Sequence, residues 1–125
     1  MLDTSRNRAE IEYAVMLAVL DFQTQYMKSH YTRATVHLVE DLIEITLAKT
    51  SSIPAEDRLG ESPEGRAMLQ QVHASLFMSG ESLLRHKLER ELGTKIRHLH
   101  TFLNIPEGTN TIIIKLDGVL DGTSA

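Results

Sequence analysis

Two histidines separated by a single residue are the side chains of this sequence with the clearest capacity for chemistry. His98 and His100 fall in a segment that alternates as a β-strand does, so both imidazoles would point to one face of a sheet. Neutral imidazole is a common metal ligand. His37 and Glu44 are expected on the same face and would complete a ligand set. One hypothesis is therefore a metal-binding protein or a metal-dependent enzyme. The alternative is the polar, solvated face of an edge strand.

The start of a helix offers a second candidate site. Ser62, followed by a proline and a glutamate, has the pattern of an N-cap, and the free amides of a helix start attract phosphate or carboxylate. Gly65 and Arg66 follow in the first turn, and the arginine could assist such an anion. The chain has neither a glycine-rich phosphate loop nor a dinucleotide fingerprint. The sequence thus leaves open a small-anion sensor or a capped, solvent-exposed helix start.

A third candidate is a set of apolar side chains on the expected outer face of a sheet. The set comprises Val39, Leu42, Ile96, Phe102 and Ile113. Exposed patches of this kind commonly mark interfaces. The first helix also carries Met16, Leu17 and Leu20 beyond a single apolar stripe, which either a neighbouring subunit or extra burial within the monomer would explain. We therefore expect a homo-oligomer, in its simplest form a dimer. Its interface would be the outer sheet face, the extra side of the first helix, or both.

The composition is typical of one soluble globular domain. The chain has 125 residues, 42% of them hydrophobic, a net charge of -4 and no cysteine. The acidic balance argues against nucleic acid as a partner, and the lack of cysteine is compatible with a reducing cytoplasm. The apolar run Ala14–Leu20 is far shorter than the ~20 residues of a membrane span. Acidic residues precede it, so we expect neither a signal peptide nor direct membrane insertion.

Two helices are expected to position these candidates. The first runs over about residues 6–28, with an N-cap oxygen supplied from residues 3–5. The second begins at Ser62 and ends before Gly93, a residue type that commonly follows a helix. Its expected apolar stripe comprises Leu69, Val72, Leu76, Leu83, Leu84, Leu88 and Leu92. The pair Ser79–Gly80 in its middle weakens the helix or lets another element approach closely.

Four strands are expected, two after each helix. A hairpin with Glu40 and Asp41 as its two-residue turn gives one wholly apolar face. The pairs that meet on that face are Ala34–Leu47, Val36–Ile45 and Leu38–Ile43. A polar connection over residues 50–61 leads to the second helix, and the last strands cover about 95–103 and 111–116.

This order of elements predicts an α+β fold. Its αββαββ arrangement indicates a two-layer sandwich, in which two helices cover one face of a four-stranded antiparallel sheet. The order resembles a circularly permuted ferredoxin-like fold, whose second and fourth strands would lie at the centre of the sheet. We expect a single domain over residues 1–118 and a flexible tail over residues 119–125.

Several segments resemble a small bacterial domain family of unknown function, called MpsC-like. The resemblance rests on the runs Pro54–Leu59 and Ser62–Arg66, the first helix from Arg8 onward, and Leu92–Lys95 leading into the third strand. It covers about residues 5–117. The family is connected by name with sodium-translocating systems that generate a membrane potential. The resemblance implies an accessory role beside an ion or bicarbonate transport system.

These features together favour a non-enzymatic interaction or regulatory module. We expect it to be cytoplasmic and homo-oligomeric, to need no cofactor, and to have a protein partner in a membrane-associated system. The metal hypothesis at His98, His100 and His37 and the anion hypothesis at Ser62, Gly65 and Arg66 remain as alternatives.

Overall fold

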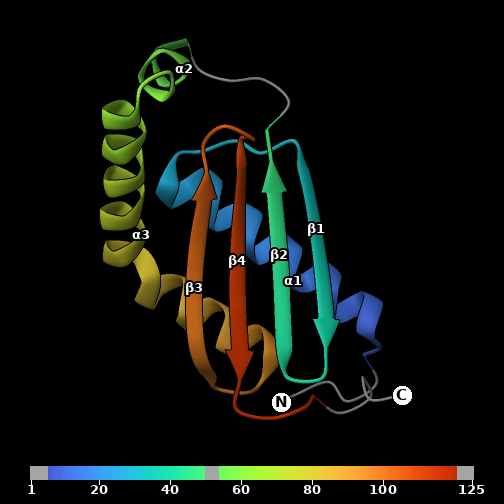
Figure 1. Ribbon diagram of the computed structural model, residues 1–125. Coiled ribbons are helices and arrows are strands. Elements are labelled where there is room, and N and C mark those ends of the chain that lie inside the picture. The colour runs from blue at the N-terminus through green and yellow to red at the C-terminus, as the bar shows by residue number, and fades with distance from the viewer. Residues whose placement is uncertain (1–5, 50–53, 121–125) are drawn as a thin grey trace.

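The protein is a four-stranded antiparallel sheet with helices on one face and along one edge (Figure 1). The computed structural model describes residues 6–49 and 54–120. Its elements are α1 (Arg8–Phe22), the π-helical turn η1 (Gln23–Met27), β1 (Arg33–Val39), β2 (Leu42–Ala48), α2 (Pro54–Gly60), α3 (Pro63–Leu92), β3 (Ile96–Asn104) and β4 (Thr109–Leu116). The strand order β1-β2-β4-β3 places β2 and β4 at the centre, as predicted. The expected α+β sandwich is therefore confirmed.

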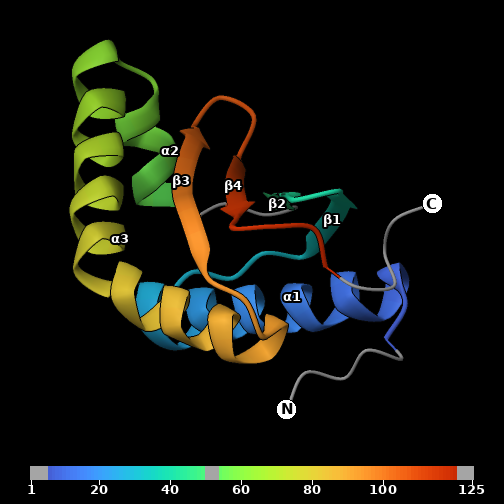
Figure 2. The same cartoon turned by 90° about the horizontal axis from the view of Figure 1, so that it is seen from below.

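The core lies between the inner face of the sheet, α1 and the second half of α3 (Figure 2). Its fully buried members from β2 and β4 include Ile43, Ile45, Leu47, Ile112, Ile114 and Leu116. The helices contribute, among others, Val15, Val19, Leu84 and Leu88. Alternating strand residues meet helix residues spaced three and four apart, which is how two such layers exclude water.

The first hairpin has the predicted register. Its turn consists of Glu40 and Asp41, and Leu38 lies opposite Ile43. Glu40 takes a left-handed backbone conformation with φ 57°, which tight hairpins demand although glutamate does not favour it. Neighbouring strand β4 holds the turn in place, because the Leu116 amide donates to the Asp41 carbonyl at 2.8 Å.

Helix α1 begins at a different cap from the one expected. Asn7 is the N-cap: its side chain accepts from the Glu10 amide at 2.9 Å, and the Glu10 carboxylate accepts from the Asn7 amide at 3.2 Å. This reciprocal pair is a capping box, which satisfies two amides at once. The cap expected from residues 3–5 is thus wrong, and those residues lie outside the described part of the chain. The helix finishes through η1, where Lys28 turns left-handed with φ 56°.

Helix α3 begins and ends as predicted, with Ser62 as N-cap and Gly93 as the left-handed residue that closes it. The helix bends in its middle, and its first half runs beside the edge strand β3 (Figures 1 and 2). We call this first half, residues 63–79, the α3 arm. A Cβ on Gly80 would lie 2.3 Å from the Tyr26 ring. The close approach that the Ser79–Gly80 pair suggested is therefore real.

Two hydrogen bonds accompany this bend. The Ser79 hydroxyl donates to the Leu76 carbonyl at 2.8 Å, and its oxygen lies 2.7 Å from the Tyr26 hydroxyl. A serine that bonds back to its own helix competes with the backbone ladder and favours bending. Only Leu84, Leu88 and Leu92 of the predicted stripe are buried, whereas Val72, Leu76 and Leu83 are exposed. The prediction of one continuous buried stripe was wrong, because the arm runs along the edge of the sheet and buries Phe77 in place of Val72 and Leu76, while Leu83 lies on the exposed side of the second half.

The connection between β2 and α3 contains a short helix that was not predicted from the sequence. Helix α2 starts at Pro54, with Glu56 and Asp57 in its first turn, which is the usual composition of a helix start. It packs on the beginning of α3 so closely that a Cβ on Gly65 would lie 1.8 Å from the Leu59 carbonyl oxygen. A glycine at this position is therefore what allows the two helices to meet.

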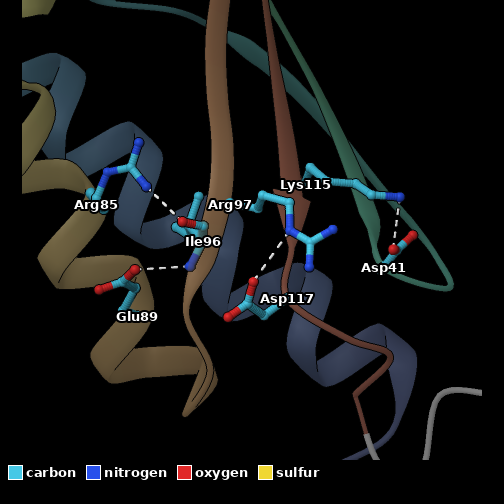
Figure 3. Close-up of polar contacts among 7 residues, drawn as sticks. All are labelled: Asp41, Arg85, Glu89, Ile96, Arg97, Lys115 and Asp117. Atoms are coloured by element: carbon cyan, nitrogen blue, oxygen red, sulfur yellow. Dashed lines mark hydrogen bonds and ion pairs between the residues drawn. The ribbon is translucent and has the colours of Figure 1, made fainter.

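A β-bulge near the start of β3 changes which face its first residue occupies. Ile96 pairs with Leu116 and His98 with Lys115, so Arg97 is an extra residue on this strand. Ile96 is consequently buried, with 5% of its surface exposed, and its place in the outer apolar patch was wrong. Side chains of α3 hold it there: Glu89 accepts from the Ile96 amide at 2.8 Å and Arg85 donates to its carbonyl at 2.7 Å (Figure 3).

The segment after β4 returns to the core. Val119 is exposed but Leu120 is buried, with 5% of its surface accessible. The expectation of a free tail from residue 119 was therefore wrong for Leu120, and residues 121–125 lie outside the described part of the chain.

Candidate functional site

A cleft of about 540 Å³ lies at the end of the sheet where the α3 arm and α2 stand. Its walls come from the loop after η1, the end of β2, α2, the α3 arm and the β3–β4 connection. Apolar side chains form one side, including Met27, Leu69, Val72, Leu76, Leu103 and Ile105. This volume is in the range of small-molecule sites, which are typically apolar with a few polar groups.

A chain of polar side chains lies at the base of this cleft. His73 and Tyr31 line the cleft itself. The Thr101 hydroxyl donates to Asn110 Oδ1 at 2.7 Å and lies 3.3 Å from His73 Nε2. Since the single threonine proton goes to the amide oxygen, Thr101 accepts from His73, which fixes that imidazole with its proton on Nε2. Asn110 is fully buried, and a hydrogen bond from its side chain to the Tyr31 hydroxyl acts on the pKa of that phenol.

Burial and charge adjust the titration of the groups in the cleft. Burial lowers the pKa of His73, and the positive charge of Lys49 lowers it further. Burial raises the pKa of Tyr31, the Asn110 side chain opposes that rise, and the charge of Glu56 adds to it. Lys49 Nζ lies 5.4 Å from the centroid of the Tyr31 ring and 3.5 Å from Glu56 Oε2. Near neutral pH the base of the cleft thus holds one cation, a neutral imidazole and a neutral phenol.

The structure brings together only two of the three histidines of the metal hypothesis. His98 and His100 project from β3 with stacked rings whose centroids are 6.0 Å apart. His37 lies in the same row of the sheet as His100, but β2 and β4 separate them, which amounts to roughly 14 Å at the usual strand spacing. Within residues 6–49 and 54–120, no three histidine, aspartate or glutamate side chains are close enough to hold a metal ion.

The helix start at Ser62 is occupied by its own cap. Ser62 Oγ accepts from the Gly65 amide at 3.0 Å, and the Arg66 guanidinium donates to the Gly60 carbonyl at 2.9 Å. Gly65 is buried beneath the end of α2. The three residues of the anion hypothesis are therefore neighbours, but their hydrogen-bonding groups serve the corner between α2 and α3.

Two apolar surfaces are exposed on the outer side of the molecule. On the outer face of the sheet, Val39, Leu42 and Phe102 are 61%, 41% and 59% exposed, while Ile113 is partly buried between its neighbours. We call these four residues the sheet patch. The second surface is the stripe of α3 formed by Met68, Val72, Leu76 and Leu83, which follow the helical period on one side and are between 36% and 60% exposed. We call these four residues the α3 stripe.

The extra apolar residues of α1 divide between burial and exposure. Leu20 packs against the core and Met16 is partly covered, whereas Leu17 is 49% exposed. Leu17 lines a shallow groove between α1 and the second half of α3. Ion pairs between Arg6 and Glu91 and between Lys87 and Asp21 join the two helices along this groove.

The cleft was not predicted from the sequence. Its polar residues come from the loop after η1, two strands and α3, and none of them forms a spaced motif. One signal was present: Asn110 interrupts the apolar alternation of β4 at a position that faces the core. A buried amide at such a position normally has a partner, so it marks a polar site inside the fold.

Comparison with known proteins places this architecture in a named class. The model of the family described as "Na+-translocating membrane potential-generating system (MpsC)" matches residues 7–118. The chain belongs to the MpsC family. It is similar to a protein of Bacillus subtilis (strain 168) described as "Uncharacterized protein YbcI", with 23% identity over 111 residues that cover 89% of each chain. No solved structure matches the chain.

None of the helices within residues 6–49 and 54–120 combines the length and the apolar character needed to cross a bilayer.

Proposed function

We propose that the protein is a non-enzymatic, cytoplasmic interaction module that works as a homo-oligomer, in its simplest form a dimer. The observation that carries this proposal is the α3 stripe, because three of its four residues lie on the arm and face away from the core. Val72 and Met68 expose 60% and 56% of their surface there. Exposed apolar surfaces of this extent on a folded chain commonly serve as interfaces.

The position of the arm favours a second copy as the partner. The arm stands beside β3 at the edge of the sheet (Figure 1). The sheet patch lies on the outer face that this edge borders. Phe102, on β3 itself, is the member of the patch closest to this edge. In a two-fold dimer the arm of each copy would cover the sheet patch of the other, so that both apolar surfaces are buried together.

We further propose that this module is an accessory component of a sodium-translocating system. The support is the description of the family to which the chain belongs. In this role the module contacts a membrane-embedded partner through its surface and does not itself carry ions.

Size-exclusion chromatography with light scattering tests the oligomer. At micromolar concentration we expect the mass of a dimer. Val72→Glu in the α3 stripe and Phe102→Glu or Leu42→Glu in the sheet patch should each shift it to the monomer, because an unpaired charge buried in an apolar interface is costly. Gln71→Glu adds the same charge on another side of the arm and should leave the dimer intact. A monomer at all micromolar concentrations contradicts the oligomer proposal.

The accessory role has a separate test in cells that carry the gene. Deleting the gene should reduce the membrane potential that depends on sodium, measured with a potential-sensitive dye. The Gln71→Glu chain should restore that potential and the Phe102→Glu chain should not. A sodium-dependent potential that is unchanged by the deletion would contradict the accessory role without affecting the dimer.

A further inference from the structure

We propose that the cleft beside the α3 arm binds a small organic cation, a protonated primary amine with a hydrocarbon body, whose charge lies against the carboxylates of Glu61 and Glu107. This inference goes beyond the proposed function, since it assigns a ligand to the cleft and does not depend on the oligomeric state.

The first observation is the negative charge around the cleft. Four carboxylates line it against two ammonium groups, and they belong to Glu56, Asp57, Glu61 and Glu107. One of the two ammonium groups is already engaged, because Lys49 Nζ is 3.5 Å from Glu56 Oε2 and lies over the Tyr31 ring. A cleft whose lining has an excess of carboxylates attracts cations and repels anions.

The base of the cleft does not offset this charge. Burial and the charge of Lys49 lower the pKa of His73, so its imidazole is neutral near pH 7. Burial raises the pKa of Tyr31, so its phenol is neutral as well. Arg66, whose guanidinium donates to the Gly60 carbonyl at 2.9 Å, does not line the cleft. The excess of negative charge therefore remains for a ligand to neutralise.

The second observation is that Glu61 and Glu107 come from two segments in contact. A Cβ on Gly60 would lie 3.1 Å from Ile105 Cγ2, so the end of α2 touches the β3–β4 connection. Glu61 follows Gly60 directly, and Glu107 comes two residues after Ile105. Both glutamates are exposed, and neither forms an ion pair within residues 6–49 and 54–120. One side of the rim thus presents two carboxylates to a cation.

The third observation is the apolar wall behind this rim. Its side chains come from the arm and from the β3–β4 side, and they include Leu69, Val72, Leu76, Leu103 and Ile105. Val72 and Leu76 expose 60% and 36% of their surface, so this wall is open to solvent. A hydrocarbon body lying along it would remove apolar surface of both molecules from water. A ligand with its charge at the rim and its hydrocarbon body inside the cleft satisfies both regions.

Calorimetric titration of the full chain with hexylamine at pH 7 tests the proposal. We expect saturable binding with a Kd below about 1 mM. Hexanol has the same body without the charge, hexanoate has the opposite charge, and methylamine has the charge without the body. All three should bind at least about tenfold more weakly than hexylamine. Because the carboxylates are exposed, raising the salt concentration from about 0.02 M to about 0.5 M should weaken hexylamine binding several-fold.

A pair of double variants separates the rim from the overall charge of the chain. Glu61→Gln with Glu107→Gln should weaken hexylamine binding by about tenfold. Glu40→Gln with Glu44→Gln removes the same charge at two exposed positions of the first hairpin, which do not line the cleft, and should leave binding unchanged. Equal effects of the two double variants would overturn the assignment to the rim.

Nuclear magnetic resonance on the unaltered chain gives a readout that does not depend on any variant folding. Hexylamine should shift the backbone amide signals of Glu61 and Glu107 and the methyl signals of Leu69 and Ile105. The proposal is overturned if no saturable binding occurs, if hexanol or hexanoate binds as tightly as hexylamine, or if the shifted signals lie outside the cleft. Light scattering on the same samples reports the oligomeric state separately, so this result and the test of the dimer remain distinguishable.

Discussion

His73 is a residue whose neutral form the fold prefers. Its imidazole is partly buried, donates through Nε2 to Thr101, and lies within reach of the charge of Lys49. Burial and this charge both lower its pKa from the usual value of 6.5. The unfolded chain therefore binds a proton at a higher pH than the folded chain does. Stability from this residue is fully present above pH 6.5 and is lost as the pH falls through the lower pKa of the folded state.

The corresponding prediction is that the free energy of unfolding decreases as the pH is lowered from about 8 to about 5, and that His73→Gln reduces the decrease. Urea unfolding at several pH values measures it. His86→Gln, at an exposed histidine of the same helix, is the matched control and should keep the slope of the wild type. Asp41 does not interfere in this range, because its hydrogen bond to Lys115 lowers the pKa of its carboxyl below 3.8. Equal slopes for both variants would contradict this role of His73.

Ile96 and Phe102 give a second prediction at the scale of single residues. Both are large apolar residues of β3, yet Ile96 is 5% exposed and Phe102 is 59% exposed. Ile96→Ala should lower the free energy of unfolding by about 2–5 kcal/mol, because it leaves a cavity in the core. Phe102→Ala should cost about 1 kcal/mol or less in the monomer. Denaturant unfolding at a concentration where the chain is monomeric compares the two. Similar losses for both variants would contradict the bulge at Arg97.

At the scale of elements, the contact between η1 and α3 depends on Gly80. The edge of the Tyr26 ring takes the place of a side chain at this position, and the tyrosine hydroxyl reaches Ser79. Tyr26 also stacks on Phe22, with ring centroids 5.3 Å apart, so the ring has core residues behind it. The joint is thus closely packed on both sides.

We predict that Gly80→Ala destabilises the protein by about 1–3 kcal/mol, although alanine is the better helix former. The new methyl group would displace the Tyr26 ring and loosen the joint. Thermal and urea unfolding measure the change. Gly118→Ala is the control, since nothing lies within 4 Å of a Cβ at that position. Stabilisation by Gly80→Ala would show that the ring can move away without cost.

Most elements could be predicted from local patterns, and the exceptions have physical causes. The register of the first hairpin followed from the apolar alternation of seven-residue strands, and both ends of α3 followed from Ser62 and Gly93. Whether the predicted stripe on α3 is buried depends on the bend of that helix. The bend lies at the contact between Gly80 of α3 and Tyr26 of η1, two residues far apart in the sequence. Alternation likewise failed at Arg97, because one extra residue in a strand reverses every side chain before it.

The candidate site was less predictable than the elements. The cleft depends on the path of the α3 arm and on α2, and its donors are brought together only by tertiary structure. Pairs close in sequence, such as His98 and His100, were easy to notice and did prove adjacent. His37 was assigned to them from its sheet face alone. The predicted strand order, with the second and fourth strands at the centre, already implied that His37 lies on the opposite edge strand, and the structure confirms that order.

At the scale of the whole molecule, the two edges of the sheet are protected to different extents. Along β3, side chains of α3 bind the backbone: Gln70 donates to the Leu103 carbonyl at 3.3 Å, and Arg85 and Glu89 bind Ile96. Along β1, Glu12 accepts from the Leu38 amide at 2.7 Å. Edge strands that carry such side-chain contacts are poor templates for further strands. The proposed dimer accordingly uses the arm and the sheet face and not the extension of the sheet.

The α3 arm has a mechanical consequence. Residues 63–79 form a rod of about 25 Å at the rise of an α-helix, with Gly80 and Tyr26 as its fulcrum. A rotation of about 5° at that fulcrum would displace the tip by about 2 Å. Val72 and Leu76 belong to the rod, and they both line the cleft and form part of the α3 stripe. A molecule whose binding widens the cleft would therefore tilt the arm and change the surface that a partner contacts. Because coupling between two sites is reciprocal, binding of that partner would change the affinity of the cleft for the molecule by the same factor.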